Sequence, residues 1–210
     1  TQAGGPMPPA NVDTFTSILP HVRFFVMYGQ TEGTARLAYL PSDMLREKLG
    51  SCGIPIPGVE IEIRDAEGAV CAVGETGEIH AKGRNIMLGY WRNEEATQRT
   101  VVDGWLKTGD LAHRDADGYI FIDGRASDMI KSGAHRISPQ EIEEVIAEID
   151  GVAEVAVTGV PDEVLGQAVK AVIVLKPGAV LERTEVRAYC VDNLARHKVP
   201  SQVSFATDLP

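Results

Sequence analysis

Cysteine is scarce in this sequence and follows no pairing pattern. Cys52, Cys71 and Cys190 are odd in number and widely spaced, and none forms a CxxC pair. A small domain held by disulfides needs an even and denser set of cysteines, and a structural zinc site needs closely spaced ligands. The sequence therefore argues against both and fits a reducing cytoplasm. We expect Cys190 to be a core residue on the apolar face of a helix.

An excess of positive charge, a long apolar run and histidine motifs are also missing. The 20 Lys and Arg residues stand against 30 Asp and Glu, a formal net charge of −10 that argues against a nucleic-acid or anionic-membrane partner. The longest apolar stretch, 168–175, is far shorter than the roughly 20 residues of a membrane span. The five histidines show neither HxxxH nor HExxH spacing, which indicates no histidine metal site. No signal peptide is visible, although Thr1 is not a natural start, and we predict a cytoplasmic location.

The length and composition fit a soluble globular protein with one large domain or two small ones. The chain has 210 residues, 44% hydrophobic and 24% charged, which is an ordinary balance and enough to bury a core. It contains no internal repeat and no low-complexity segment. Strands and turns dominate up to about residue 125, and a pattern with helices follows. We therefore predict a domain boundary at that position.

Alternating patterns predict an antiparallel sheet in the first part. The apolar positions Val12, Phe15 and Ile18 predict a helix over 11–19, which Pro20 ends. Further along, turns that contain glycine separate short runs of alternating apolar and polar residues. The expected strands are 22–27, 59–64, 77–81 and 119–122. Their density predicts a small barrel or an open sheet. The first strand delivers Tyr28 into a loop, where α/β proteins place ligands.

The second part is expected to be a compact α+β unit. Ser138-Pro139-Gln140-Glu141 matches a capping box with proline at the first helical position, and an apolar stripe follows it. The runs 152–160 and 168–175 predict two strands separated by Pro161-Asp162. A last amphipathic helix, with Cys190 on its apolar face, is expected to end near Pro200.

Two short blocks combine residue types that can hold a nucleotide. In Tyr28-Gly29-Gln30-Thr31-Glu32 the ring can stack on a purine, the hydroxyl can hold phosphate, and the carboxylate can bind Mg²⁺, which prefers hard oxygen ligands. In Trp105–Leu111, Asp110 follows a Thr-Gly pair near a strand end, where it can accept hydrogen bonds from two ribose hydroxyls. A turn with capping residues accounts for either block alone. Arg125 can equally be an exposed arginine paired with a nearby carboxylate.

Together, the order and spacing of these blocks resemble the adenylate-forming (AMP-binding) enzymes. These include acyl- and aryl-CoA ligases, peptide-synthetase adenylation domains and luciferases. The segments Gly83–Trp91 and 124–142 follow the same order, so the resemblance covers nearly the whole chain. It implies an ATP-dependent ligase that activates a carboxylic acid, as a small-molecule substrate, to an acyl-adenylate and transfers the acyl group to CoA, with ATP, Mg²⁺ and CoA as cofactors.

The resemblance also implies roles for individual residues. Thr31 is expected on phosphate and Glu32 on Mg²⁺, as the catalytic pair. The expected nucleotide site comprises Gly4, Gly5 and Pro6 beside adenine, Tyr28 stacked on it, the loop Gly29-Gln30-Thr31, Asp110 and Arg125 on the ribose, and Ile122 beside the nucleoside. Lys131-Ser132-Gly133 is expected along the pantetheine channel of CoA, where glycine lets the backbone approach a thin ligand. An ordinary turn is the alternative there. Ser127 stands at the hinge, where many members carry Asp or Lys.

The implied fold class is mixed α/β and α+β. Residues 1–124 would be the C-terminal part of the large nucleotide-binding domain, with the end of an α/β layer and an antiparallel barrel-like subdomain. Residues 125–210 would be a mobile α+β lid. The family's phosphate loop would precede Thr1 and its catalytic lysine would follow Pro210, so we expect a fragment that forms no adenylate alone. A peptide-synthetase-type adenylation domain and a non-catalytic nucleotide-binding module are the alternatives, and the acid is not named by these residues.

Overall fold

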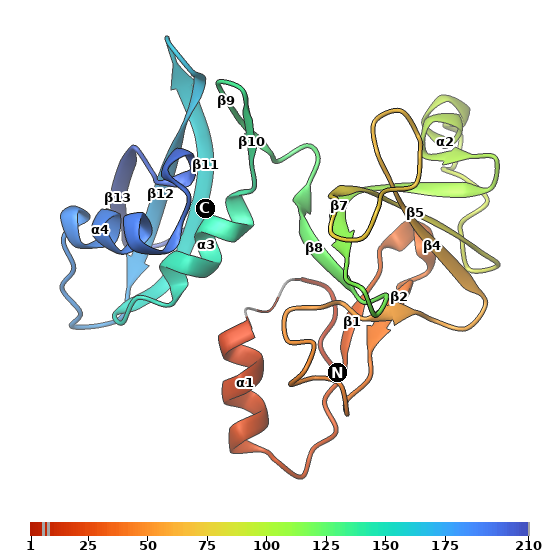
Figure 1. Cartoon of the computed structure of the whole chain (residues 1–210), viewed down its shortest axis with the longest axis horizontal. Coiled ribbons are helices and arrows are strands. Elements are labelled where there is room, and N and C mark those ends of the chain that lie inside the picture. Colours follow the sequence, from red (N-terminus) through yellow and green to blue (C-terminus); the bar gives the residue numbers. More distant parts are fainter. Residues whose placement is uncertain (6, 8, 210) are drawn as a thin grey trace. The chain divides into compact units, whose positions relative to one another are not determined.

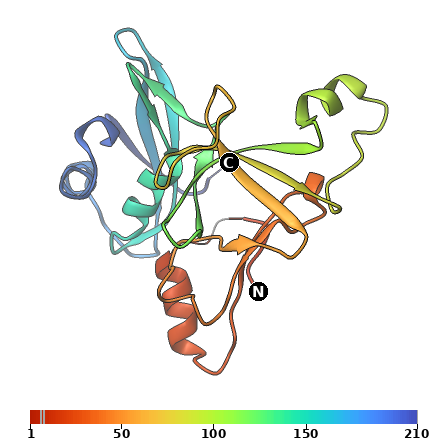
Figure 2. The ribbon, with the colours of Figure 1, turned by 45° about the vertical axis from the view of Figure 1, so that its right-hand side comes forward.

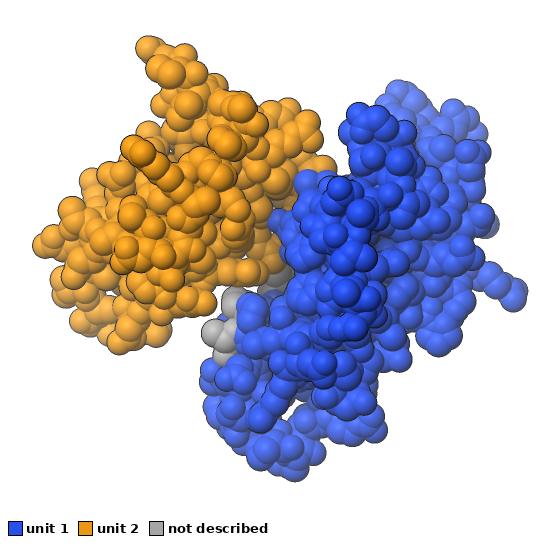
Figure 3. Space-filling view, viewed as in Figure 1, with its two compact units in different colours: residues 1–123 blue, residues 124–210 orange. Residues whose placement is uncertain are grey.

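The chain folds into two compact units, residues 1–123 and 124–210 (Figure 3). A computed structural model describes residues 1–5, 7 and 9–209, so Pro6, expected beside adenine, lies outside the described residues. Among the described helices, none has both the length and the apolar character needed to cross a membrane.

The first unit begins with a helix and a small antiparallel sheet (Figure 1). The helix α1 (Pro9–Ile18) confirms the expected helix, and it buries Val12 against Phe24 and Leu40. The sheet consists of β1 (Val26–Tyr28), β2 (Ala38–Leu40) and β3 (Ile54–Pro55), and the 3₁₀ helix η1 (Thr31–Gly33) follows β1. The expected strand 22–27 was too long at its start. Val22 lies in a bend after Pro20 and is 40% exposed, so strand pairing begins only at Val26.

A larger antiparallel sheet completes the first unit. Its strands are β4 (Val59–Arg64), β5 (Gly77–Gly83), β6 (Val101–Val102), β7 (Trp105–Arg114) and β8 (Ile120–Arg125). They are ordered β4-β5-β7-β6, with β8 on β7, and helix α2 (Glu94–Thr100) lies beside one end of the sheet (Figure 2). Alternation works as expected, because Ile61, Ile63 and Ile79 enter one core while their neighbours stay outside it.

The second unit packs helices on a mixed sheet. Its strands are β9 (Ile130–Ser132), β10 (His135–Ile137), β11 (Val152–Asp162), β12 (Gly166–Leu175) and β13 (Gln202–Ala206). Its helices are α3 (Pro139–Ala147), α4 (Arg183–Asn193) and the 3₁₀ helix η2 (Arg196–Lys198). The helix α3 packs on β11, α4 packs on β13, and the two helices contact each other, so they cover the same face. Cys190 is fully buried in this core, as expected. The mixed fold class predicted from the sequence is confirmed.

The expected capping box at Ser138 is wrong, although Pro139 does open the helix. The Ser138 side chain makes no capping hydrogen bond, and its Oγ is buried without a partner in the described part of the chain. That oxygen lies against the α-carbon side of Gly124, 3.0 Å from where a Cβ would stand. A reciprocal capping box occurs instead at α4, between Glu182 and Glu185.

Candidate functional site

The loop after β1 is a tight, backbone-ordered turn. Tyr28 ends the strand, and Gly33 and Thr34 donate backbone hydrogen bonds to the carbonyls of Gln30 and Thr31. A Cβ on Gly29 would lie 2.3 Å from the Ala35 carbonyl oxygen, so only glycine fits this position. The loop thereby holds Thr31 exposed at its surface and Glu32 half-buried beside it.

One hydrogen bond joins the two sequence blocks that were predicted to hold a nucleotide. The Tyr28 hydroxyl donates to Asp110 Oδ2 at 2.6 Å, although the residues are 82 positions apart. Both side chains are buried, at 8% and 7% exposure. Burial, and then the Asp110 charge and this hydrogen bond, raise the pKa of Tyr28 well above its usual range. The phenol therefore stays protonated and keeps donating to the carboxylate.

A bulge in β7 aims Asp110 toward Tyr28. Glu78 pairs with Leu111 and His80 with Lys107, so Ile79 of β5 faces three residues of β7. Within the bulge Gly109 has a φ of +75°, and its N–H donates to Glu78 Oε1 at 3.0 Å. The Thr108 hydroxyl donates to the Ile79 carbonyl at 2.8 Å and accepts from the Asp110 N–H at 3.1 Å. Bulges of this kind redirect side chains next to functional sites.

A second segment holds Glu32 from the other side of the loop. The Tyr90 hydroxyl donates to Glu32 Oε1 at 2.7 Å, and the Met87 N–H donates to the Glu32 carbonyl at 2.7 Å. Asn85 donates to the carbonyls of Gly33 and Arg36, at 3.1 and 2.8 Å. The hydrogen bond to Glu32 raises the pKa of Tyr90. Sequence reasoning missed Asn85 and Tyr90 as individual residues, because the block that contains them served only as a family match.

Other expected residues of the nucleotide site lie near these blocks or at their ends. Gln2 forms a parallel bridge with Val26, so Gly4 and Gly5 follow a segment that runs beside β1. Ile122, on β8, is half-buried and packs against the core that contains Tyr28. Gln30 precedes η1, and its amide nitrogen is buried without a hydrogen-bond partner among the described residues.

The remaining expected residues belong to the second unit. Arg125 ends β8 and is exposed. Ser127 is exposed in the following turn, where its hydroxyl donates to the neighbouring Asp128 at 2.7 Å. Lys131-Ser132-Gly133 forms the end of β9 and the turn into β10, with Gly133 at a φ of +58°. The Gly133 N–H donates to the Leu165 carbonyl at 2.8 Å, which fixes the turn on the β11–β12 hairpin.

Glu32 and Thr31 carry hard oxygen atoms of the kind that Mg²⁺ prefers. The described residues contain no cluster of three or more His, Cys, Asp or Glu side chains that could hold an ion. Glu32 is the single carboxylate of its loop. Mg²⁺ usually keeps several waters and binds through one or two carboxylates plus substrate phosphates. One carboxylate beside an exposed Thr31 hydroxyl fits that pattern.

In the first unit, the bond between Tyr28 and Asp110 joins the two sequence blocks that were predicted to hold a nucleotide. The model for AMP-binding enzymes matches residues 1–91, and the model for the AMP-binding enzyme C-terminal domain matches residues 141–210. The chain therefore belongs to the AMP-binding, adenylate-forming enzymes.

Several proteins similar to this chain are CoA ligases. The long-chain-fatty-acid–CoA ligase of Yersinia pestis is 42% identical over 183 residues, 87% of this chain and 32% of that protein. The 2-succinylbenzoate–CoA ligase of Bacillus cereus (strain Q1) is 37% identical over 207 residues, 99% of this chain and 42% of that protein. The o-succinylbenzoate CoA synthetase of Bacillus subtilis, solved with its acyl-adenylate intermediate, matches at a TM-score of 0.91 and 36% identity, covering 99% of this chain and 42% of that one. The same synthetase has been solved with ATP and a magnesium ion. The chain thus spans 32% to 42% of the length of these relatives.

Proposed function

We propose that the natural protein carrying this chain is an AMP-forming acid–CoA ligase, and that residues 1–123 supply part of its nucleotide site. The relatives that support this proposal act on acids as different as a long-chain fatty acid and 2-succinylbenzoate, at similar identity to this chain. Similarity to these relatives therefore does not identify the acid on which the natural protein acts. A cytoplasmic location also stays a proposal, supported by the absence of paired cysteines.

The hydrogen bond between Tyr28 and Asp110 carries the proposal. It joins the end of β1, which leads into the Thr31-Glu32 turn, to the bulge of β7 in a single folded unit. A ribose-binding carboxylate and a phosphate-binding turn would have to lie close together in an ATP site, and the bond between Tyr28 and Asp110 supports that arrangement. Glu32, held by Tyr90, adds a carboxylate for the magnesium ion of MgATP.

The proposed reaction has two steps. A carboxylate oxygen of the acid attacks the α-phosphorus of ATP, the bond to pyrophosphate breaks, and an acyl-adenylate forms. The CoA sulfur then attacks the acyl carbonyl, AMP leaves, and the thiol proton passes to solvent. Such chemistry needs positioning and charge neutralisation more than covalent participation by the protein. Asp110 would orient the ribose, Thr31 would contact phosphate, and Glu32 would hold the metal of the nucleotide.

We propose the second unit as the mobile lid of this reaction, with Ser127 as its hinge. Ser127 lies in an exposed turn next to the division between the units, and its side chain bonds only the adjacent Asp128 within the described chain. A hinge needs only a residue that can absorb a change of backbone torsion. The ordered turn at Gly133 would then present backbone to the pantetheine of CoA.

ATP–pyrophosphate exchange by the complete natural protein tests the nucleotide role. Asp110→Asn keeps the shape of the side chain and removes its charge, so the KM for ATP should rise about tenfold or more, as expected for lost hydrogen bonds to a charged group. Asp13→Asn, on the exposed face of α1, is the matched control and should change nothing. An unchanged KM for ATP in folded Asp110→Asn would contradict the proposal. The 210 residues alone should give no exchange, because they span less than half of their relatives.

The acceptor is tested separately. With acid and ATP present, free CoA should be consumed as thioester forms, whereas a peptide-synthetase-type domain would transfer only to a pantetheinylated carrier protein. Transfer to the carrier alone would replace CoA by a carrier in the proposed second step. It would leave the adenylation step as proposed.

A further inference from the structure

The carboxylate of Glu32 accepts a hydrogen bond from a neutral side chain that lies far along the chain. Its Oε1 accepts from the hydroxyl of Tyr90, 58 residues further along the chain, at 2.7 Å. No ion pair to Glu32 occurs within the described chain. A lysine or arginine partner would neutralise the carboxylate, whereas a phenol orients it and leaves its charge available to a cation.

Tyr90 is itself fixed by helix α2. Its backbone N–H donates to the Thr97 hydroxyl at 2.9 Å, and that hydroxyl donates to the Asn93 carbonyl at 2.9 Å. Asn93 caps the helix by accepting from the Ala96 N–H at 3.0 Å. At Gly89, φ is +150° and a Cβ would lie 2.7 Å from the Thr97 methyl group, so the approach to Tyr90 is also tight.

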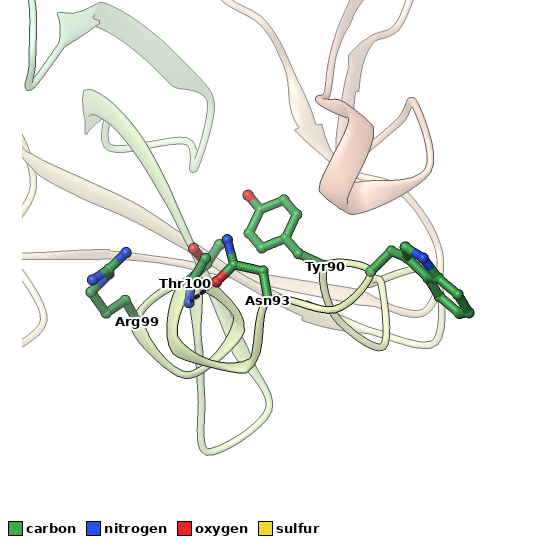
Figure 4. Close-up of a pocket in the computed structure, with 6 residues that line it drawn as sticks. Tyr90, Asn93, Arg99 and Thr100 are labelled. Atoms are coloured by element: carbon green, nitrogen blue, oxygen red, sulfur yellow. Dashed lines mark hydrogen bonds between the residues drawn. The ribbon is translucent and has the colours of Figure 1, made fainter.

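Tyr90, Asn93 and Ala96 also line an open pocket of about 490 Å³. Figure 4 shows Tyr90 and Asn93 side by side among the residues that line it. Tyr90 is 37% exposed, so water can compete for its hydroxyl, yet the hydroxyl donates to Glu32. The backbone bonds at Tyr90 and Met87, rather than burial, are what set the geometry of this partly exposed bond.

We propose that Tyr90 is a positioning residue for Glu32: it holds Oε1, and the second carboxylate oxygen would be left to bind the magnesium ion of a nucleotide. This inference rests on the proposed function, since it concerns the same nucleotide site. The helix α2, through Thr97, sets the backbone at Tyr90 and thereby the orientation of Glu32. Met87 holds the Glu32 backbone from the same segment.

Calorimetric titration of the complete natural protein with ATP, once with excess Mg²⁺ and once with EDTA, tests this role without requiring catalysis. Tyr90→Phe removes only the hydroxyl. The gain in ATP affinity on adding Mg²⁺ should shrink about 3- to 10-fold, as expected for one hydrogen bond to a charged group at a partly exposed site. Affinity in EDTA should stay at the wild-type value. Tyr39→Phe, in the same unit and with no hydroxyl hydrogen bond within the described chain, should behave as wild type.

A double-mutant cycle separates action through Glu32 from a general structural effect. Glu32→Gln should remove most of the Mg²⁺-dependent gain, and adding Tyr90→Phe to it should cause no further loss. The inference is overturned if Tyr90→Phe keeps the full Mg²⁺-dependent gain, if it weakens ATP binding equally with Mg²⁺ and with EDTA, or if the two substitutions add. Wild-type protein that binds no ATP would instead overturn the proposed function and, with it, this inference.

Discussion

Replacing Tyr28 by phenylalanine removes one hydroxyl and leaves the buried ring in place, so it isolates the bond to Asp110. The bond is 2.6 Å long, and its partners are only 8% and 7% exposed, so water cannot replace the lost donor. A hydrogen bond to a charged group contributes about 1.5–3 kcal/mol to stability. With a urea dependence of about 2 kcal/mol per molar, the unfolding midpoint should fall by about 1 M.

Tryptophan fluorescence can follow this unfolding in the first unit alone. Both tryptophans, Trp91 and Trp105, lie in residues 1–123. The control is Tyr39→Phe on the neighbouring strand β2, which should change the free energy of unfolding by less than about 0.5 kcal/mol. The cycle with Asp110→Asn should show a coupling of about 1 kcal/mol or more between the two side chains. Equal costs for Tyr28→Phe and Tyr39→Phe, or additive costs in the cycle, would refute the reasoning.

Three further predictions concern stability and reactivity. Burial lowers the pKa of His80, whereas the unfolded side chain titrates near 6.5. As the pH falls through about 6.5 the unfolded state takes up the proton first, so the free energy of unfolding in urea should fall there, and fall less in His80→Gln. Burial raises the pKa of Cys52 to about 12, so in native protein a thiol reagent should react fast only with the half-buried Cys71. Ser138→Ala should leave the free energy of unfolding of the second unit unchanged or raise it, because Oγ is buried without a partner among the described residues. Glu185→Ala breaks the capping box of α4 and should lower that free energy by roughly 0.5–2 kcal/mol; calorimetry measures both.

Each of these has a result that contradicts it. An identical pH dependence in wild type and His80→Gln would show that another group controls the acid side of stability. Equal labelling rates for all three cysteines in native protein would contradict the burial of Cys52 and Cys190. A loss above about 1 kcal/mol in Ser138→Ala would show that its hydroxyl has a partner that stabilises the fold.

Local patterns were sufficient for elements whose residues carry their own periodicity. The alternation of 59–64 gave β4 with the same bounds, and the apolar stripe around Ile142 and Ile146 gave a helix that buries both. These local patterns do not show which strands pair with each other in a sheet. The strand β13 (Gln202–Ala206) lies parallel to β12, and its five residues are too few for their alternation to specify a strand without that neighbour. It is defined by its neighbour, which sequence periodicity does not describe.

In the candidate site, too, local patterns predicted some residues, and others depended on tertiary contacts. Tyr28, Glu32 and Asp110 were found because each combines with its neighbours into a recognisable block. Tyr90 was not assigned, since its significance depends on a contact with Glu32 across 58 residues. The Ser138 cap failed for a related reason, because a capping motif states which bonds are possible while tertiary packing decides where the side chain turns.

The bulge of β7 constrains the length of the segment between Lys107 and Leu111 as strictly as it constrains the residue types there. It adds two residues opposite Ile79, and two is an even number, so Leu106, Thr108, Asp110 and Ala112 all remain buried on one face. Deleting one residue between Lys107 and Leu111 would put the two halves of the strand out of phase and turn one set of side chains to the opposite face. Deleting two would restore the phase but remove the bulge that aims Asp110. The effect of a substitution in this segment should therefore depend on the size and charge of the new side chain. A change in length instead decides, by whether it is odd or even, which face the side chains of the whole strand take.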